Sequence, residues 1–322
     1  MDQILPIVVG LLLLVAGAEL LVRSSVYVAL RLGVSPLVVG LTIVSVGTSA
    51  PELVASVAAA LQKSPGIAVG NIVGSNIANG LLVAGAAALI FPLRVARVTL
   101  RRDGVIAFVA ALLFWAVCWL GLLNWIVGIF LLLSLALYVW QSYREADPVV
   151  ASAGVPEGSV AGPMARFGAL AIPVAILGAI AGAGLLAFGG NLMVEAAVTL
   201  AQALGISEAV IGLTIIAVGT SLPELVTSML AAFRRQSDIA FGNVIGSNIF
   251  NLLGIGGVTA ILSQGEIPQR LVVFDFPVML AATAVLLLFA ATGRRVGRRE
   301  GGLLVGAFVL YIGVVWWQSQ LG

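Results

Sequence analysis

A block of forty residues occurs twice in this chain, and the two copies begin 172 positions apart. The copies span residues 40–79 and 212–251, and 24 of their 40 aligned positions are identical without a gap. Each copy contains "GTSxPEL" followed by "GNxxGSNxxN". The two halves of the chain are therefore homologous, and the fold must consist of two similar units.

The composition places both units in a membrane. Of the 322 residues, 61% are hydrophobic and only 9% are charged, whereas about 25% of the residues in a soluble domain are charged. Apolar runs near 20 residues, the length of a transmembrane helix, recur along the chain. We therefore expect an all-α polytopic membrane protein with ten transmembrane helices, at residues 4–30, 36–61, 66–90, 104–121, 124–143, 167–200, 207–232, 239–262, 272–292 and 302–320.

Basic residues are distributed very unequally between the two sides that these helices define. One side receives only Lys63 and Arg270. The other side receives the remaining fourteen, which are Arg23, Arg31, Arg94, Arg97, Arg101, Arg102, Arg144, Arg166, Arg234, Arg235, Arg294, Arg295, Arg298 and Arg299. The positive-inside rule places the arginine side in the cytoplasm and both termini outside it.

The helix count also predicts how the two units are related. We expect a first five-helix repeat at residues 1–143, a Pro-, Gly- and Ser-rich cytoplasmic linker at 144–165, and a second five-helix repeat at 166–322. Because five is odd, the second repeat must cross the membrane in the opposite sense. Inverted repeats are typical of secondary transporters, whose substrate site lies where the repeats meet, near the midplane.

Glu52 and Glu224 occupy equivalent places near the middle of the second and seventh predicted helices. A carboxylate at that depth costs about 2.5–3.5 kcal/mol on insertion scales and persists where it faces a cavity, a partner or an ion. No lysine or arginine lies in the middle of any predicted helix. The two glutamates are therefore expected to bind protons or metal cations.

The residues around the glutamates favour metal. Pro51 and Pro223 each remove a backbone donor, which frees the carbonyls of Gly47 and Gly219 and loosens their neighbours. An ordinary proline kink would explain a single Thr-Ser-x-Pro segment. Both copies, however, place a glutamate directly after the proline, which favours an ion site. The predicted oxygen donors of this segment, backbone or hydroxyl, are Ser45, Thr48, Ser49, Ala217, Thr220 and Ser221. Hard cations such as Ca²⁺ and Na⁺ prefer oxygen ligands of this kind.

The third and eighth predicted helices add further polar side chains. Ser75 and Asn79 are four residues apart and share a helix face, as do Ser247 and Asn251, so these four side chains are predicted to complete the ion site. The other asparagines are predicted to form hydrogen bonds between helices; they are Asn71, Asn76, Asn243 and Asn248. Glu19 and Glu195 are weaker candidates for the ion site.

On the "GTSxPEL" and "GNxxGSNxxN" blocks, the chain closely resembles the sodium/calcium exchangers of the calcium/cation antiporter superfamily, in a compact prokaryotic form. The resemblance implies that Glu52 and Glu224 bind Ca²⁺ with the carbonyls of Thr48 and Thr220. It implies that Na⁺ uses the same glutamates with Ser75, Ser247 and the carbonyls near Ser45 and Ala217. It further implies that Asn79 and Asn251 flank the centre and that the first and sixth helices slide to alternate access. The large cytosolic regulatory domain of animal exchangers is missing, and a prokaryotic cytoplasmic membrane is the expected location.

The predicted function is Na⁺/Ca²⁺ antiport, with Ca²⁺/H⁺ antiport and a cation channel as alternatives. A channel usually surrounds its pore with oligomeric rings, whereas this site is built from two halves of one chain. No phosphate-binding loop, histidine or cysteine-based catalytic set is present, so an enzyme is not expected. The lipid bilayer, Na⁺ and Ca²⁺ are the expected partners, without a cofactor, nucleic acid or obligate protein partner.

Overall fold

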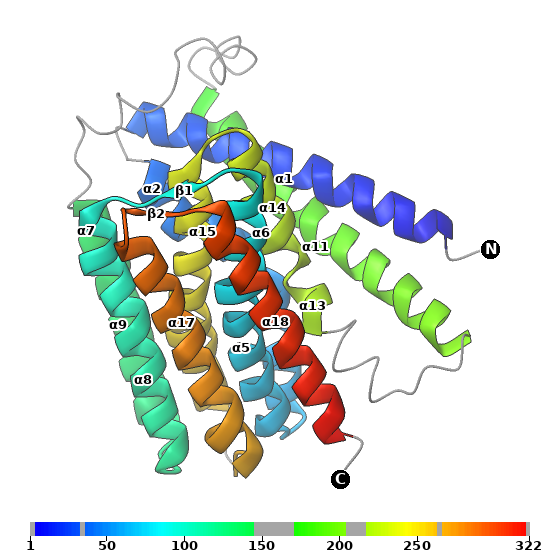
Figure 1. Ribbon diagram of the computed structural model, residues 1–322, viewed down its shortest axis with the longest axis vertical. Helices are drawn as coiled ribbons and strands as arrows, with labels where there is room; N and C mark the ends of the chain where they lie inside the picture. The colour runs from blue at the N-terminus through cyan, green and yellow to red at the C-terminus, as the bar shows by residue number, and fades with distance from the viewer. Residues whose placement is uncertain (1–3, 33–35, 145–170, 204–216, 263–265, 320–322) are drawn as a thin grey trace.

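The computed structural model describes residues 4–32, 36–144, 171–203, 217–262 and 266–319. Over these residues the chain is almost entirely helical (Figure 1). Eight helices are long and apolar enough to cross a membrane, and a ninth span is formed if the bent pair Leu37–Thr48 and Ala50–Leu61 is counted as one. The structure therefore confirms a mostly helical, multi-pass arrangement.

In the first half of the chain, the second and third predicted helices are each divided into several shorter helical elements. Its elements are α1 (Ile4–Leu32), α2 (Pro36–Val39), the π-helix η1 (Gly40–Val44), α3 (Ser45–Thr48), α4 (Ala50–Leu61), α5 (Pro65–Ala78), the π-helix η2 (Asn79–Val83), α6 (Ala84–Ile90), β1 (Leu93–Arg94), α7 (Arg97–Thr99), the π-helix η3 (Leu100–Gly104), α8 (Val105–Trp119) and α9 (Trp125–Arg144).

The second half repeats this order where it is described. Its elements are α11 (Ala171–Ala203), α13 (Ala217–Thr220), α14 (Leu222–Phe233), α15 (Ser237–Ile249), the π-helix η6 (Phe250–Ile255), α16 (Gly256–Leu262), the π-helix η7 (Leu271–Asp275), α17 (Phe276–Ala291), β2 (Arg295–Val296) and α18 (Arg298–Ser319). Strand β1 pairs antiparallel with β2, with Leu93 opposite Val296.

These elements follow the predicted helices closely, with ends shifted by a few residues. The largest difference is the fourth predicted helix, which begins at Arg97 rather than at residue 104. The start of the predicted helix 207–232 and all but the first residue of the predicted linker 144–165 lie outside the described residues.

Two long helices, each with a π-helical stretch near its middle, form the centre of the bundle (Figure 1). The span Pro65–Ile90 is 78% buried and Ser237–Leu262 is 83% buried, whereas α9 and α18 are only 22% buried. The outer helices expose large apolar side chains such as Leu133 and Leu303. Polar residues therefore concentrate in the centre, and the outer surface is suited to lipid.

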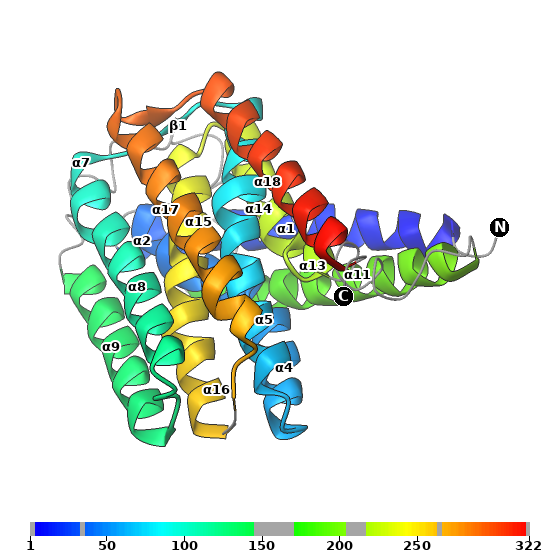
Figure 2. The same cartoon turned by 60° about the horizontal axis from the view of Figure 1, so that its bottom comes forward.

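Helices α1 and α11 pack against each other and run obliquely to the rest of the bundle (Figure 2). Their crossing depends on glycine, because an added Cβ at Gly17 would lie 2.8 Å from the carbonyl oxygen of Gly182. A Cβ at Gly10 would lie equally close to the carbonyl oxygen of Gly189. The pairing of 10 with 189 and 17 with 182 shows that the two helices are antiparallel.

Replacing Gly17 with alanine is expected to destabilise the protein, because the new methyl group meets backbone atoms that no rotamer change can move. Overpacking of this kind costs about 1–3 kcal/mol, which should appear as a lower midpoint of thermal unfolding in detergent. Gly184→Ala is the matched control on α11, since no atom lies within 4 Å of an added Cβ there. Equal midpoints for the two variants would contradict this account of the crossing.

Candidate ion-binding site

Both copies of "GTSxPEL" break their helix at the serine. Helix α3 ends at Thr48 and α4 begins at Ala50, and the two helical pieces are bent by 48°. Ser49, between them, has φ −82° and ψ 8°. Ser221 has φ −89° and ψ 8° between α13 and α14. The predicted breaks are confirmed, and their near-identical geometry follows from the proline that comes two residues later in each copy.

The breaks place each glutamate at the start of a half-helix. Glu52 lies in the first turn of α4, and Glu224 lies in the first turn of α14. The partial positive charge at a helix N-terminus stabilises a carboxylate there. Both side chains are almost fully buried, at 1% and 0% exposure. Each half-helix therefore offsets part of the cost of burying its own carboxylate.

Serines from opposite halves of the chain connect the two glutamates. Ser49 Oγ donates to Glu224 Oε1 at 2.8 Å, and Ser221 Oγ donates to Glu52 Oε1 at 3.4 Å. The crossed hydrogen bonds therefore bring both acids into one site, although 172 residues separate them in the chain.

The predicted residues of the central helices are buried here without hydrogen-bond partners. Among the described residues nothing bonds to the Oγ atoms of Ser75 and Ser247, or to either side-chain polar atom of Asn79 and Asn251. The second oxygens, Oε2, of Glu52 and Glu224 are also unpartnered. Unpaired polar groups at membrane depth cost several kcal/mol each. Their concentration at the predicted ligands fits the oxygen donor set of a cation site.

The central helices change their winding at the same asparagines. The π-helix η2 begins at Asn79, and η6 (Phe250–Ile255) contains Asn251 at its second residue. Single π-turns within α-helices are rare and occur frequently at functional sites. No periodic pattern in the sequence predicts them, since a π-turn is only one residue longer than an α-turn.

Asn71 and Asn243 have the structural role predicted for them. Asn71 Nδ2 donates to the carbonyl oxygen of Glu52 at 3.1 Å and to Ser56 Oγ at 2.9 Å. Asn243 Nδ2 makes the equivalent bonds to the carbonyl oxygen of Glu224 at 3.5 Å and to Ser228 Oγ at 2.9 Å. Each asparagine therefore braces the half-helix that carries the glutamate.

The structure differs from the expectation at Ser45. Its carbonyl oxygen accepts hydrogen bonds from the Ser49 amide at 2.9 Å and from Thr48 Oγ1 at 3.2 Å, so the break leaves it bonded rather than free. Its hydroxyl donates to the carbonyl oxygen of Gly40 at 2.6 Å, inside η1. The structure places Ala217 and Thr220 at the two ends of α13, in the second copy of the segment.

The weaker acidic candidates are separate from this site. Glu19 forms ion pairs with Arg23 on its own helix and with Arg234 at the end of α14. Glu195 is exposed on α11. No group of three or more His, Cys, Asp or Glu side chains gathers anywhere in the described ranges. A metal ion at the centre would therefore have two carboxylates, with hydroxyl, amide and carbonyl oxygens as its other ligands.

Sequence reasoning missed a second pair of buried acids, Asp103 and Asp275. Tyr138 donates to Asp103 Oδ1 at 3.2 Å, and Tyr311 donates to Asp275 Oδ1 at 2.7 Å. The signal was available, because 103 and 275 are also 172 positions apart. Neither acid belongs to the repeated forty-residue block, where the similarity is strongest.

The crossed serine–glutamate hydrogen bonds join two helix breaks inside a multi-pass membrane protein, an arrangement typical of secondary transporters. A family model for the sodium/calcium exchanger protein matches residues 3–144 and 174–317. The chain therefore belongs to the sodium/calcium exchanger family, and it is a multi-pass membrane antiporter rather than an enzyme.

The chain is similar to known relatives and to a solved structure over nearly its whole length. The chain is 35% identical to the sodium/calcium exchanger MaX1 of Methanosarcina acetivorans, over 97% of both chains. It is 36% identical to the inner membrane protein YrbG of Escherichia coli strain K12, over 98% of this chain and 97% of the relative. A structure of the sodium-calcium exchanger NCX_Mj, soaked with Na⁺ and Ca²⁺, matches with a TM-score of 0.81 and 29% identity, over 97% of this chain and 98% of that one. These likenesses support antiport of Ca²⁺ against another cation.

Replacing Asn243 with leucine is expected to lower the free energy of unfolding by about 1–3 kcal/mol, the cost of leaving buried partners unsatisfied. The variant loses the bond to Ser228 and the contact at 3.2 Å between Asn243 Oδ1 and Thr48 Oγ1. The measurement is chemical or thermal unfolding in detergent. Asn248→Leu is the control on α15, since Asn248 forms no hydrogen bond with a described residue. A loss as large in the control would contradict the bracing role.

Proposed function

We propose that this chain exchanges Na⁺ for Ca²⁺ across a cell membrane, with both ions binding in turn at Glu52 and Glu224. The observation that carries the proposal is that the second carboxylate oxygens of both glutamates are buried without hydrogen-bond partners among the described residues, as are the side-chain oxygens of Ser75, Ser247, Asn79 and Asn251. Two carboxylates balance the charge of one Ca²⁺, and oxygen ligands are what this ion prefers. The names of MaX1 and NCX_Mj as sodium/calcium exchangers support the same assignment.

In the proposed site, the Ca²⁺ ligands are the carboxylates of Glu52 and Glu224 and the backbone carbonyls of Thr48 and Thr220. The hydroxyls of Ser49 and Ser221 hold the opposite carboxylate in place. Na⁺ binds at the same glutamates, and its further ligands are Ser75, Ser247 and the carbonyls of Ser45 and Ala217; the Ser45 carbonyl binds the ion in place of the hydrogen bond from Thr48 Oγ1. Asn79 and Asn251 flank the centre.

Sharing the carboxylates produces antiport. Once Ca²⁺ leaves, two buried negative charges remain close together, and their exposure to the low-dielectric centre is costly. Na⁺ must neutralise them before the site can turn to the other side of the membrane. The two loads are therefore mutually exclusive, and movement of one requires the return of the other.

Alternating access is proposed to use the antiparallel pair α1 and α11. These helices cover the broken segments from one side, and few bulky side chains interlock at their glycine crossing. The proposal includes ten transmembrane helices in two inverted repeats, at residues 1–143 and 166–322, joined by a cytoplasmic linker. Both termini lie outside the cytoplasm of a prokaryotic cell, as the arginine distribution indicates.

Glu52→Gln and Glu224→Gln are each expected to reduce Ca²⁺ uptake to background, because the amide keeps the shape of the side chain but removes the charge that binds the ion. Uptake of radioactive Ca²⁺ into proteoliposomes is the measurement, with gel filtration and thermal unfolding to show that each variant is folded. Glu195→Gln on α11 is the control and should exchange normally. Retained exchange in both single variants would exclude this site.

Sodium coupling is tested by loading the vesicles with different ions. We expect Ca²⁺ uptake into vesicles loaded with Na⁺, and none into vesicles loaded with K⁺ or with acidic buffer alone. Uptake driven only by the proton gradient would instead establish Ca²⁺/H⁺ antiport, with protons shared by the coupled glutamates. Uptake in all three sets, without any counter-ion gradient, would indicate a channel.

A further inference from the structure

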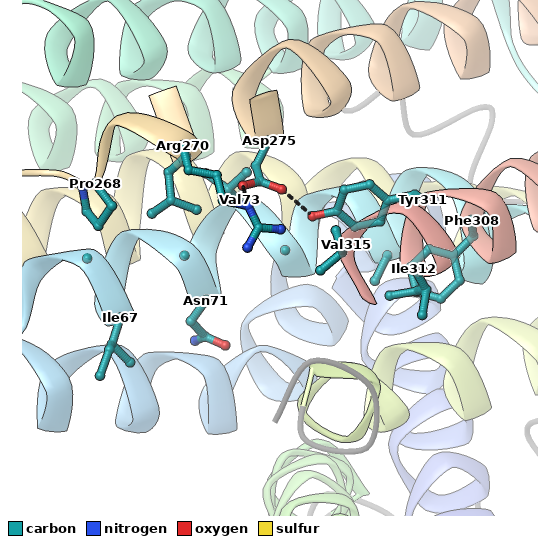
Figure 3. A pocket seen from close by; sticks show the side chains of 15 residues that line it. Ile67, Asn71, Val73, Pro268, Arg270, Asp275, Phe308, Tyr311, Ile312 and Val315 are labelled. Carbon is teal, nitrogen blue, oxygen red and sulfur yellow. Dashed lines mark hydrogen bonds and ion pairs between the residues drawn. The ribbon is translucent and has the colours of Figure 1, made fainter. Parts of the chain in front are cut away.

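A cavity of about 500 Å³ lies away from the two glutamates, between α5, η7 and α18 (Figure 3). Most of its wall is apolar and includes Phe308, Ile312 and Val315 of α18. Only Asn71 is shared with the braces of the ion site, and neither Glu52 nor Glu224 lines it. The cavity is therefore a second site, with walls of a different chemistry.

One charged pair stands out in this apolar wall. Asp275 is 3% exposed, and its Oδ1 accepts the hydrogen bond from Tyr311 at 2.7 Å. Its other oxygen, Oδ2, lies 3.9 Å from Arg270 Nε, which is too far for a hydrogen bond. Arg270 forms no hydrogen bond with any described residue. A guanidinium and a carboxylate oxygen, both with unused hydrogen-bonding capacity, thus line the same cavity (Figure 3).

The equivalent acid in the first half shows that this arrangement is not required by the repeat. Asp103 is fully buried, and Arg102 Nε lies 2.9 Å from its Oδ1 while Arg102 Nη2 lies 3.2 Å from its Oδ2. Both oxygens of Asp103 are therefore satisfied within the protein. In the second half the arginine stands five positions before the aspartate rather than next to it, and that aspartate lines this cavity.

Small residues of α5 leave room beside the charged pair. No atom lies within 4 Å of a Cβ added at Gly74, and a Cβ at Gly70 would only touch Leu271 at 3.7 Å. Ile67, one turn away on the same helix, is 69% exposed in a segment that crosses the membrane. The cavity is thus bordered by an apolar surface that faces lipid.

We propose that this cavity binds a phospholipid with a primary amine in its head group. The phosphate accepts hydrogen bonds from Arg270, since guanidinium and phosphate form strong charge-assisted pairs. The ammonium group donates to Asp275 Oδ2, whose partner Tyr311 keeps the carboxylate oriented. An acyl chain lies along the groove that Gly70 and Gly74 leave open. An anionic head group would satisfy Arg270 but bring negative charge toward Asp275.

The test is native mass spectrometry of the full-length, delipidated protein, titrated with phosphatidylethanolamine, phosphatidylcholine or phosphatidylglycerol of identical acyl chains. We expect phosphatidylethanolamine to bind about tenfold more tightly than the other two, the value of one charge-assisted hydrogen bond. Arg270→Gln should weaken binding of all three lipids. Asp275→Asn should abolish the preference among them, because its amide oxygen still accepts from Tyr311 but carries no charge.

Asp103→Asn is the matched control, since Asp103 does not line this cavity, and it should bind lipid as the original protein does. Gly74→Val fills the groove from the opposite wall without touching the charged pair, and it should weaken lipid binding even if the Asp275 variant does not fold. Equal binding of the three lipids, a preference for phosphatidylglycerol, or unchanged binding in both Arg270→Gln and Gly74→Val would overturn the proposal. Because the readout is lipid binding, it is independent of ion exchange.

Discussion

Two carboxylates at the centre of a membrane protein are the constraint on which this structure depends. Water is absent at that depth, so the charge of Glu52 and Glu224 must be offset by the protein or by an ion. The protein supplies half-helix N-termini and the crossed serine hydroxyls Ser49 and Ser221. Neither source provides a full positive charge, and the proposed exchange function assigns the remaining balance of charge to bound cations.

The arrangement of the other helices keeps this centre away from lipid. Broken helices expose backbone groups, which membranes tolerate only where protein surrounds them. The two spans packed against the broken segments, Pro65–Ile90 and Ser237–Leu262, are accordingly the most buried of those described, and the helices around them present apolar side chains outward. Asn71 and Asn243 then each donate a hydrogen bond to the first turn of the half-helix that carries the acid.

The sequence was informative where a covalent feature determines the local structure. Pro51 and Pro223 lack a backbone donor, so the helix breaks near them could be located from the sequence. The bonds of Asn71 to the Glu52 carbonyl and of Ser49 to Glu224 depend on how separate helices pack, and no spacing predicts them. The Ser45 carbonyl shows a second limit. It was expected to be loosened as a neighbour of the break, but the Ser49 amide and the Thr48 hydroxyl both donate to it.

Some contacts of the first half are repeated by identical residues in the second half, and others are not. Glu52, Ser49, Ser56 and Asn71 each have an identical residue 172 positions later, and all of them belong to the site or its braces. Glu19, which pairs with Arg234 between α1 and α14, does not, because the equivalent residues are Asn191 and Gln62.

This difference has a physical reason. In the proposed exchange mechanism, an ion held between the repeats touches both halves at once, so a change in one half alters the balance of charge for both. The pair of Glu19 and Arg234 joins only two helices, and neutral residues can replace both partners together without leaving a buried charge. Identity between the halves is therefore needed where they share an ion, and it is not needed where a contact serves one pair of helices.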